Sequence, residues 1–160
     1  MIRVLAVLAV MFPSVALAQQ VAFGSMQQDT SAPVEVTADA LSVNQSDGTA
    51  LYTGNVVIIQ GQMRLAAPRV LVVYVKGGGR IERLEATGGV TLVSGEEAAE
   101  AQRADYDIDA GSVVMSGNVL LTQGENALTS ERLVVDLESG TAQMDGRVRT
   151  VLQPAGDEGQ

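Results

Sequence analysis

A glycine-led phrase occurs four times along the 160-residue chain and constrains its fold more than any other feature. It reads Thr-Gly-Asn-Val around Gly54, Thr-Gly-Gly-Val around Gly88, Ser-Gly-Asn-Val around Gly117 and Asp-Gly-Arg-Val around Gly146. The first two glycines are 34 residues apart, and both later intervals are 29 residues. A period of roughly 20–50 residues indicates equivalent supersecondary units that stack on their neighbours. We therefore expect one domain built from a repeated unit.

The residues that follow each phrase align in register and predict strands. A second glycine comes seven positions after each of the first three, at Gly61, Gly95 and Gly124. Beyond it, apolar residues recur at every second position, which is the period of a β-strand. The window 96–103 is rich in Ala and Glu and looks helical in isolation. Because it occupies the same repeat positions as the β-branched residues near 70–75, we predict strands throughout.

The two-residue step lengthens to three at one fixed place in each unit. It occurs from Ala67 to Val70 and again from Ala101 to Ala104 and from Ser130 to Leu133. An extra residue at a fixed position is what a β-bulge or sheet corner needs to keep one face pointing inward. We predict that each unit bends once, at this step, and that the glycine of each phrase forms the turn into the next strand.

One face of these strands is consistently apolar and predicts a shared interior. Turns rich in Gly, Asp and Ser are expected at 46–48, 77–79, 109–111 and 138–140. Bent strands with one apolar face form a sandwich or a flattened barrel, so the predicted fold class is all-β. Val148, in the last phrase, is expected to face the same interior as the valines of the earlier phrases. The predicted apolar interior consists of Val36, Leu41, Val43, Val56, Ile58, Leu65, Val70, Val72, Tyr74, Leu84, Val90, Leu92, Tyr106, Ile108, Met115, Val119, Leu121, Leu128, Leu133, Val135 and Leu137.

Residues 1–18 are expected to be a secretory signal that is cleaved. A short basic start is followed by a mostly apolar run over 4–15, and Ala16-Leu17-Ala18 fits the small-x-small cleavage pattern. A retained membrane anchor is the alternative, but Pro13 interrupts the run, which is shorter than the ~20 residues that span a bilayer. Cysteine is absent, so burial and strand pairing must stabilise the exported chain without disulfides. The expected organisation after the signal is a flexible lead-in over 19–33, one β domain over 34–153 and a disordered tail over 154–160.

The side-chain inventory argues against most enzyme classes. Histidine and cysteine are both absent, which removes Ser-His-Asp and Cys-His catalysis and the usual zinc sites. Asp105, Asp107 and Asp109 resemble the start of a calcium loop, but the glycine and the closing glutamate are misplaced. Glu96, Glu97 and Glu100 could act as an acid and base, but a solvated, charged turn is the favoured interpretation. We expect no catalytic residue, no metal and no cofactor.

The formal charge limits the partners. It is −9 for the whole chain, and loss of Arg3 with the signal makes it −10. Such an acidic chain is not expected to bind nucleic acid. The only basic cluster, Lys76, Arg80 and Arg83, is expected mainly to balance Glu82 and Glu85, with an anion site as the alternative.

Taken together, these motifs resemble the OstA-like family of periplasmic lipopolysaccharide-transport proteins. The likeness covers residues 34–152 and is carried by Ala-Asp-Ala-Leu at 38–41 and by the Gly-Asn-Val phrases at 54–61 and 117–124. The resemblance implies a twisted, open β-jellyroll built from repeated bent antiparallel strands. It also implies that the apolar interior binds the acyl chains of lipopolysaccharide in the periplasm, in support of outer-membrane assembly.

The resemblance further implies partners at the two ends of the sheet. The first strand, near 36–43, would meet the jellyroll of an inner-membrane component, and the last strand, near 146–152, that of an outer-membrane barrel component. Head-to-tail self-association would use the same edges. The alternative from another class is a ligand-free β-solenoid scaffold of the cell envelope, while a carbohydrate-acting enzyme is disfavoured because aromatics are only 3% and Trp is absent.

Overall fold

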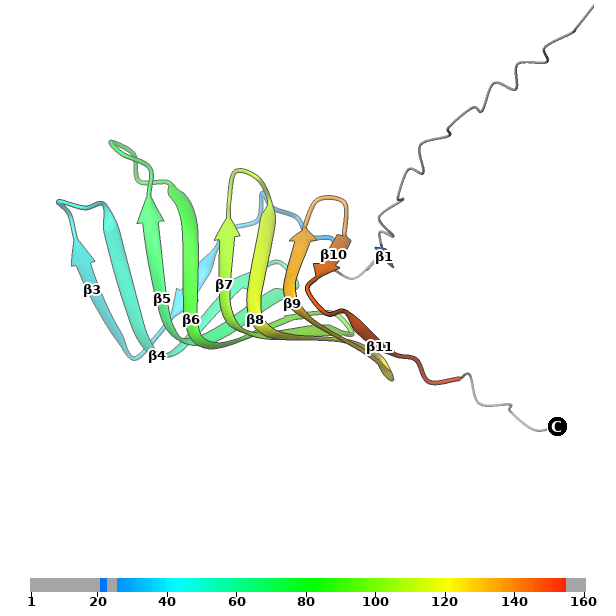
Figure 1. Ribbon diagram of the computed structural model, residues 1–160. Helices are drawn as coiled ribbons and strands as arrows, with labels where there is room; N and C mark the ends of the chain where they lie inside the picture. The colour runs from blue at the N-terminus through cyan, green and yellow to red at the C-terminus, as the bar shows by residue number, and fades with distance from the viewer. Residues whose placement is uncertain (1–20, 23–25, 155–160) are drawn as a thin grey trace, which may run out of the picture.

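The structure is a computed structural model that describes residues 21–22 and 26–154, and these form a single antiparallel sheet of 11 strands (Figure 1). The predicted all-β, open-jellyroll fold is confirmed. The strands are β1 (Val21–Ala22), β2 (Glu35–Thr37), β3 (Ala40–Asn44), β4 (Thr49–Gln60), β5 (Met63–Tyr74), β6 (Ile81–Ser94), β7 (Glu97–Asp107), β8 (Ser112–Gln123), β9 (Asn126–Asp136), β10 (Thr141–Asp145) and β11 (Arg149–Val151). Successive long strands are direct neighbours from β4 to β10, so the sheet grows along the molecule in chain order.

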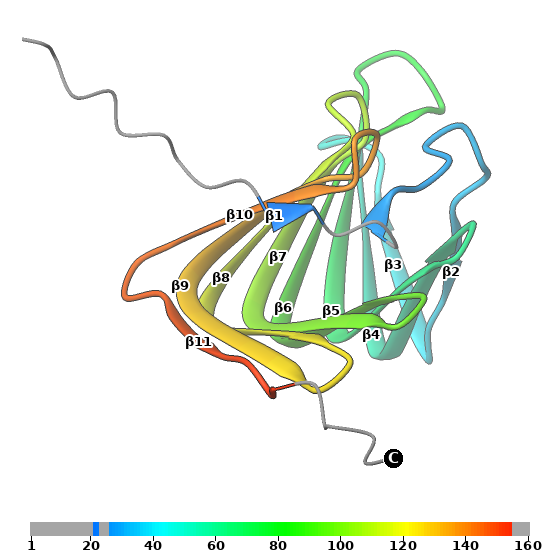
Figure 2. The ribbon, with the colours of Figure 1, turned by 90° about the vertical axis from the view of Figure 1, so that its right-hand side faces the viewer.

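Each long strand from β4 to β9 bends near its middle, and the bends divide the sheet into two facing walls (Figure 2). In wall A, β3 is followed by the halves of the long strands near the turns 45–48, 75–80, 108–111 and 137–140, then by β10 and β1. In wall B, β2 is followed by the halves near the turns 61–62, 95–96 and 124–125, then by β11. The corners close one side of the molecule. The turns of both walls border the opposite side, which we call the mouth.

Glycines with positive φ form the corners on alternate strands. Gly54 has φ +78° and the following Asn55 has φ 45°; Gly117 and Asn118 repeat this pair with +82° and 48°. The left-handed region favours Gly and, among other residues, Asn, and the first three phrases have Gly followed by Asn or Gly. In the fourth phrase Arg147 takes the second position, with φ 49°. The pairing register shifts at the same points, for example between Thr53 and Val56 in β4.

These corners correct two details of the predicted bend. The phrase glycines were expected at turns between strands, but Gly54 and Gly117 lie inside the continuous strands β4 and β8. Each unit was expected to bend once, at the three-residue step. Instead both strands of each hairpin bend, the phrase in one opposing the step in the other, since Val56 pairs with Ala67 and Thr53 with Arg69 across the shift. The sequence does not reveal this second bend, because a glycine-led phrase is also typical of a turn between two strands.

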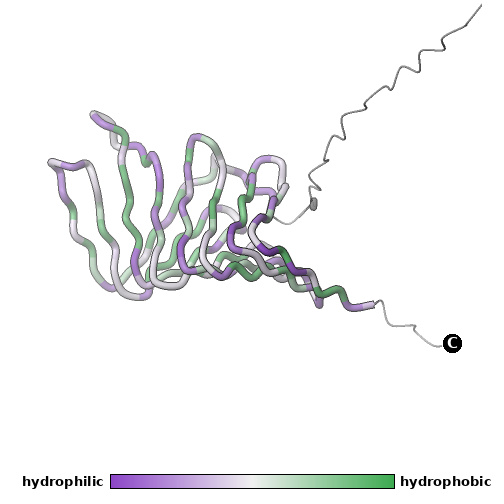
Figure 3. Tube along the Cα trace, in the orientation of Figure 1, coloured by the Kyte–Doolittle hydropathy of each residue, from purple (hydrophilic) through white to green (hydrophobic). Residues whose placement is uncertain are grey.

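The predicted turns and the predicted strand over the helix-like window are present. Residues 97–103 belong to β7, as the repeat register requires. Hydropathy alternates along the strands, and the turns at the top of Figure 3 are largely hydrophilic. The apolar residues of both walls meet in one core between them.

Part of the predicted lead-in is built into the fold, contrary to expectation. Residues 26–33 run along the mouth and contact both walls, so we call them the strap (Figure 2). Met26 is 1% exposed in the core. The polarity of the segment suggested flexibility, but its glutamines bond to the walls instead. The predicted signal at 1–18, the rest of the lead-in at 19–20 and 23–25, and the end of the tail at 155–160 lie outside the described residues.

Candidate functional site

The space between the two walls is lined by the apolar face that the repeat predicts. Most of the predicted residues are at most 2% exposed: Val56, Ile58, Leu65, Val70, Val72, Leu84, Val90, Leu92, Tyr106, Met115, Val119, Leu121, Leu133, Val135 and Leu137. Four more, Val36, Tyr74, Ile108 and Leu128, are partly buried and pack against them. The alternation places residues from distant repeats in one row, as when Ile58, Leu65 and Leu92 pair across β4, β5 and β6. The interior is thus a continuous aliphatic layer along the molecule.

Two predicted interior residues are exposed because they lie at the end of the sheet. Leu41 and Val43 are 54% and 61% exposed. Leu41 pairs with Tyr52 and Val43 pairs with Ala50 across the strands. Because Ala50 belongs to the core and Tyr52 packs against it, Leu41 and Val43 lie on the inward face of the sheet. No further strand covers β3 on its outer side in the described part of the chain. The apolar layer therefore reaches the surface at this end.

The opposite end also presents apolar side chains. Val148, Val151 and Leu152 are 51%, 44% and 68% exposed around β11. The expectation that Val148 is interior is wrong, because only the short β11 continues wall B beyond β9. At this end the edge of wall A is covered by β1, which pairs with Thr141 and Ala142 of β10.

The strap bridges the mouth by hydrogen bonds to both walls. On wall A, the backbone N–H of Gln28 donates to the carbonyl of Leu137 at 2.7 Å. On wall B, the side-chain amide of Gln60 donates to the carbonyls of Thr30 at 3.0 Å and Ala32 at 2.9 Å. A water-sized molecule does not reach the interior side chains in this closed arrangement, since they are nearly fully buried.

A row of polar side chains lines wall B directly beneath the strap. It comprises Gln60, Ser94, Glu97 and Gln123, which lie in register along the turn ends of β4, β6, β7 and β8, with Met63 between the first two. Gln60 and Ser94 are 1% exposed and Glu97 is 2% exposed. We call these four residues the polar row. It separates the aliphatic layer from the mouth.

Tyr106 ties wall A to the polar row. Its hydroxyl donates to Oε1 of Gln60 at 2.5 Å, across the interior. Burial raises the pKa of Tyr106, and the hydrogen bond to Gln60 partly offsets this. The two walls are thus connected on the mouth side by a neutral phenol and an amide.

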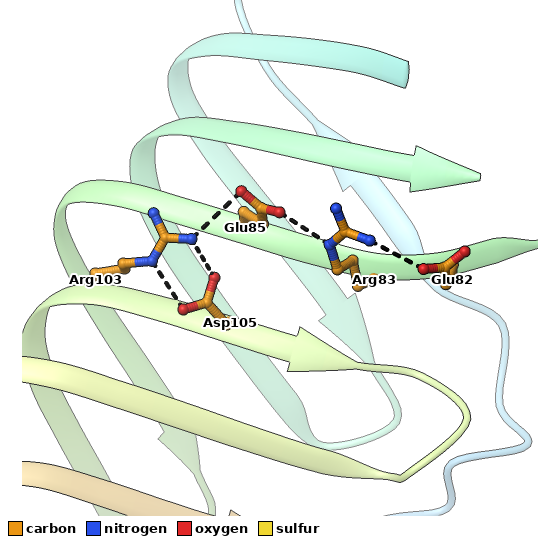
Figure 4. Close-up of polar contacts among 5 residues, drawn as sticks. All are labelled: Glu82, Arg83, Glu85, Arg103 and Asp105. Atoms are coloured by element: carbon orange, nitrogen blue, oxygen red, sulfur yellow. Dashed lines mark hydrogen bonds and ion pairs between the residues drawn. The ribbon is translucent and has the colours of Figure 1, made fainter. Parts of the chain in front are cut away.

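A ladder of ion pairs crosses the outer face of wall A (Figure 4). Arg83 contacts Glu82 and Glu85, both at 2.9 Å, and Arg103 contacts Glu85 at 3.3 Å and Asp105 at 2.6 Å. The hydrogen bond from Arg83 is the main cause that lowers the pKa of Glu85. This confirms the expectation that Arg83 balances its acidic neighbours, while Arg80 pairs instead with Asp109. The ladder joins β6 to β7 on the solvent side.

The weak motifs for metal binding and acid-base chemistry are not brought together in the described residues. No group of three or more Asp or Glu side chains there is arranged to hold a metal ion. Asp105 pairs with Arg103, and Asp107 accepts a hydrogen bond from the backbone N–H of Ala110. Nor does this part of the chain contain a helix that is long and apolar enough to cross a membrane.

Glu97 faces inward, contrary to expectation. A solvated turn was expected for Glu96, Glu97 and Glu100, and Glu96 and Glu100 are exposed, but Glu97 is buried. The signal was available in the repeat register, since Glu97 lies two residues before the inward Ala99. The period of two therefore predicts the position of Glu97 better than the charge of its side chain does. Met26, Ala50, Met63 and Val113 are further interior residues that were not predicted.

Comparison with known proteins relates the chain to a family, to a relative and to a solved structure. A family model described as "LptA/(LptD N-terminal domain) LPS transport protein" matches residues 35–141. An uncharacterized protein of Rhizobium meliloti (strain 1021) is 31% identical over 116 residues, a match that covers 67% of this chain but only 62% of the relative. The crystal structure of LptH from Pseudomonas aeruginosa, described as the LptA homologous periplasmic component of the lipopolysaccharide transport device, has a TM-score of 0.71 at 22% identity. That match covers 79% of this chain and 99% of LptH, so the two share their fold.

Proposed function

Since the chain belongs to the LptA/LptD N-terminal domain family of LPS transport proteins, we propose that it carries lipopolysaccharide through the periplasm with the acyl chains held between its two walls. The single observation that carries this proposal is the unbroken aliphatic layer that runs the length of the sheet. An acyl chain gains about 0.8 kcal/mol for each CH₂ removed from water. A layer of this chemistry suits the apolar part of a glycolipid and offers no reactive group to modify it.

The net charge of −9 is compatible with this role if the anionic part of the lipid stays outside. The outer face of wall A carries the ion-pair ladder, and its arginines are already neutralised by carboxylates. Affinity must therefore come from the apolar chains, as the buried composition of the interior implies. We infer a carrier without catalytic activity.

The exposed ends of the sheet support a bridging role. Edge strands offer unpaired backbone groups to a partner strand, and continued pairing would extend the apolar layer from one molecule to the next. In our proposal β3 meets an inner-membrane jellyroll component and the β11 end meets the jellyroll of an outer-membrane barrel component. The exposed Leu41 and Val151 lie at these two ends. Copies of the chain would join in the same head-to-tail manner.

Site-specific photocrosslinking tests the carrier function. A photoreactive residue is placed at Leu92, at 0% exposure, or at the partly buried Leu128, and the protein is irradiated in cells that make lipopolysaccharide. A glycolipid adduct is expected at both positions. The matched controls are Val93 and Thr129, which alternate to the outer face and are exposed. Adducts that are absent, or equally strong at the control positions, contradict the proposal.

A structural scaffold is the second candidate, because the interior side chains are packed to near-zero exposure. Val113, Leu121, Leu133 and Val135 are all 0% exposed, as in an ordinary protein core. A scaffold of this kind would hold no ligand. It predicts no adduct at Leu92 or Leu128 while the protein remains folded and assembled, so the same experiment separates the two functions.

A further inference from the structure

The polar row is an anomaly in an otherwise aliphatic interior. Glu97 is 2% exposed, and only one of its carboxylate oxygens is paired: Oε1 accepts from the side-chain amide of Gln123 at 2.9 Å. Oε2 is buried without a hydrogen-bond partner. A buried carboxylate is costly unless donors satisfy it, so an acceptor left open in a folded protein calls for an explanation.

The strap places an amide group on the same row. The side-chain amide of Gln28 donates to the hydroxyl of Ser94, and its carbonyl oxygen accepts from the backbone N–H of Gln62 at 3.2 Å. Ser94 is the direct cross-strand partner of Glu97. The side chain of Gln28 is buried although it belongs to a strap at the protein surface. A carboxamide thus occupies the entrance to the aliphatic layer, on the residue that pairs with Glu97 across the strands.

We propose that the polar row is a binding site for a hydrogen-bond donor at the head of an acyl chain, an amide N–H or a hydroxyl, and that Gln28 holds this site in the free protein. The chain would extend into the aliphatic layer while its amide or hydroxyl replaces the carboxamide of Gln28. The open Oε2 of Glu97 then receives the donor that it lacks. This inference rests on the proposed function and adds the part of the lipid that the protein recognises.

The chemistry of the row determines which head groups it accepts. A carboxylate is only an acceptor when ionised, so it favours donors such as amides and alcohols. An ester offers no donor, and a free acid or phosphate would bring a second negative charge toward Glu97. The row would therefore select acyl chains by the group to which they are attached, a choice that the aliphatic layer cannot make.

Two simple lipids test the proposal: the primary amide of a long saturated fatty acid and the methyl ester of the same acid. Their dissociation constants are measured on the purified protein by displacement of a fluorescent fatty-acyl probe. The wild type is expected to bind the amide about tenfold more tightly, because one hydrogen bond to a charged acceptor is at stake. Glu97→Leu is expected to remove this preference and leave binding of the ester unchanged or stronger.

Two variants guard against misfolding and against a general effect of charge. Glu97→Gln keeps the shape of the side chain but can donate to an ester carbonyl, so the preference should narrow while the protein stays folded by circular dichroism. Glu100→Leu removes an exposed carboxylate from the same strand and should retain the wild-type preference.

A third variant, Gln28→Ala, tests the role of the strap. It removes the side-chain amide that occupies the site in the free protein and should tighten binding of the fatty amide.

The outcomes are separable. If both lipids bind with equal affinity to the wild type and to Glu97→Leu, the polar row has no role in recognition and the inference is overturned, while the carrier function stands. If neither lipid displaces the probe, and the probe itself does not bind, the carrier function fails first. Tighter binding of the ester than of the amide by the wild type also overturns the inference.

Discussion

The corner glycines show how a single residue controls the shape of this molecule. A Cβ built on Gly88 would lie 2.6 Å from Cγ of Pro68, and one built on Gly117 would lie 2.6 Å from Oε1 of Gln102. Each glycine therefore faces a side chain from the corner of the neighbouring strand. Both also have positive φ, +92° and +82°, where a side chain is strained in any case. The repeat keeps glycine because the backbone and the opposing corner both require it.

We predict that Gly88→Ala destabilises the protein by about 2 kcal/mol or more, since a left-handed residue with a Cβ costs roughly 1–2 kcal/mol before any clash. The rigid ring of Pro68 cannot move aside easily. Gly79→Ala is the control, because a Cβ there meets nothing within 4 Å and its φ lies outside the positive region. Urea unfolding measures both. Equal unfolding midpoints for the two variants would refute the corner argument.

For individual residues, the two-residue period of the sequence predicted which side chains point inward, because successive side chains of a pleated β-strand point to opposite faces. It placed Leu92 and Leu121 correctly without any knowledge of the fold. Glu97 was missed because its charge suggested solvent, and the strap was missed because its partners are distant in sequence. Gln28 contacts Gln62 and Ser94, and neither contact leaves a local pattern. The exposure of residues at the two ends of the sheet could not be predicted either, because the alternation of side chains does not show which strand is the last in the sheet.

The ion-pair ladder belongs to the scale of the strands, because it links β6 and β7 on the face that carries no core. Glu85 sits between Arg83 and Arg103 and accepts from both. The pKa of Glu85 is lowered, chiefly by the hydrogen bond from Arg83. A carboxyl whose folded pKa lies below its unfolded pKa stabilises the fold above the unfolded value and loses that contribution as pH falls through the folded value.

We therefore predict that Glu85→Gln lowers stability at neutral pH by less than about 1 kcal/mol, because the pairs are partly exposed. On acidification through the lowered pKa of Glu85, the wild type should lose more stability than this variant, so the two curves converge. The test is the urea midpoint as a function of pH. Glu96→Gln, in the exposed turn at 95–96, is the control and should follow the wild-type curve. A constant difference between wild type and Glu85→Gln at all pH values would contradict the assignment.

At the scale of the whole molecule, the two ends differ in what they offer a partner. The β3 end presents a strand of five residues, all exposed, with Leu41 and Val43 continuing the inward row. At the other end, β1 already covers β10, which leaves β11 with its three exposed residues as the available edge. A partner that pairs along the full edge must therefore displace β1.

Head-to-tail association makes a matched pair of substitutions informative. Leu41→Lys puts a charge on the inward face of β3, where a docked copy would continue the aliphatic layer, and should weaken self-association about tenfold or more, since a buried unpaired charge is costly. Ser42→Lys adds the same charge on the opposite face and should have a much smaller effect. Sedimentation velocity over a range of concentrations measures the association. The same mass distribution for both variants would argue against pairing through this face.

The unequal first interval of the repeat has a consequence for how such a molecule can grow. Gly54 and Gly88 are separated by five residues more than the later glycines, and the extra length lies at the mouth end of this unit, in the turn 75–80 and the adjoining ends of β5 and β6. The register beside the corner is the same in these units, since Arg69 pairs with Thr87 as Arg103 pairs with Ser116, although the units differ in length at the mouth. The width and the length of this fold can therefore vary independently. Insertions at the turns extend the rim of the mouth, whereas added repeat units lengthen the sheet along the molecule.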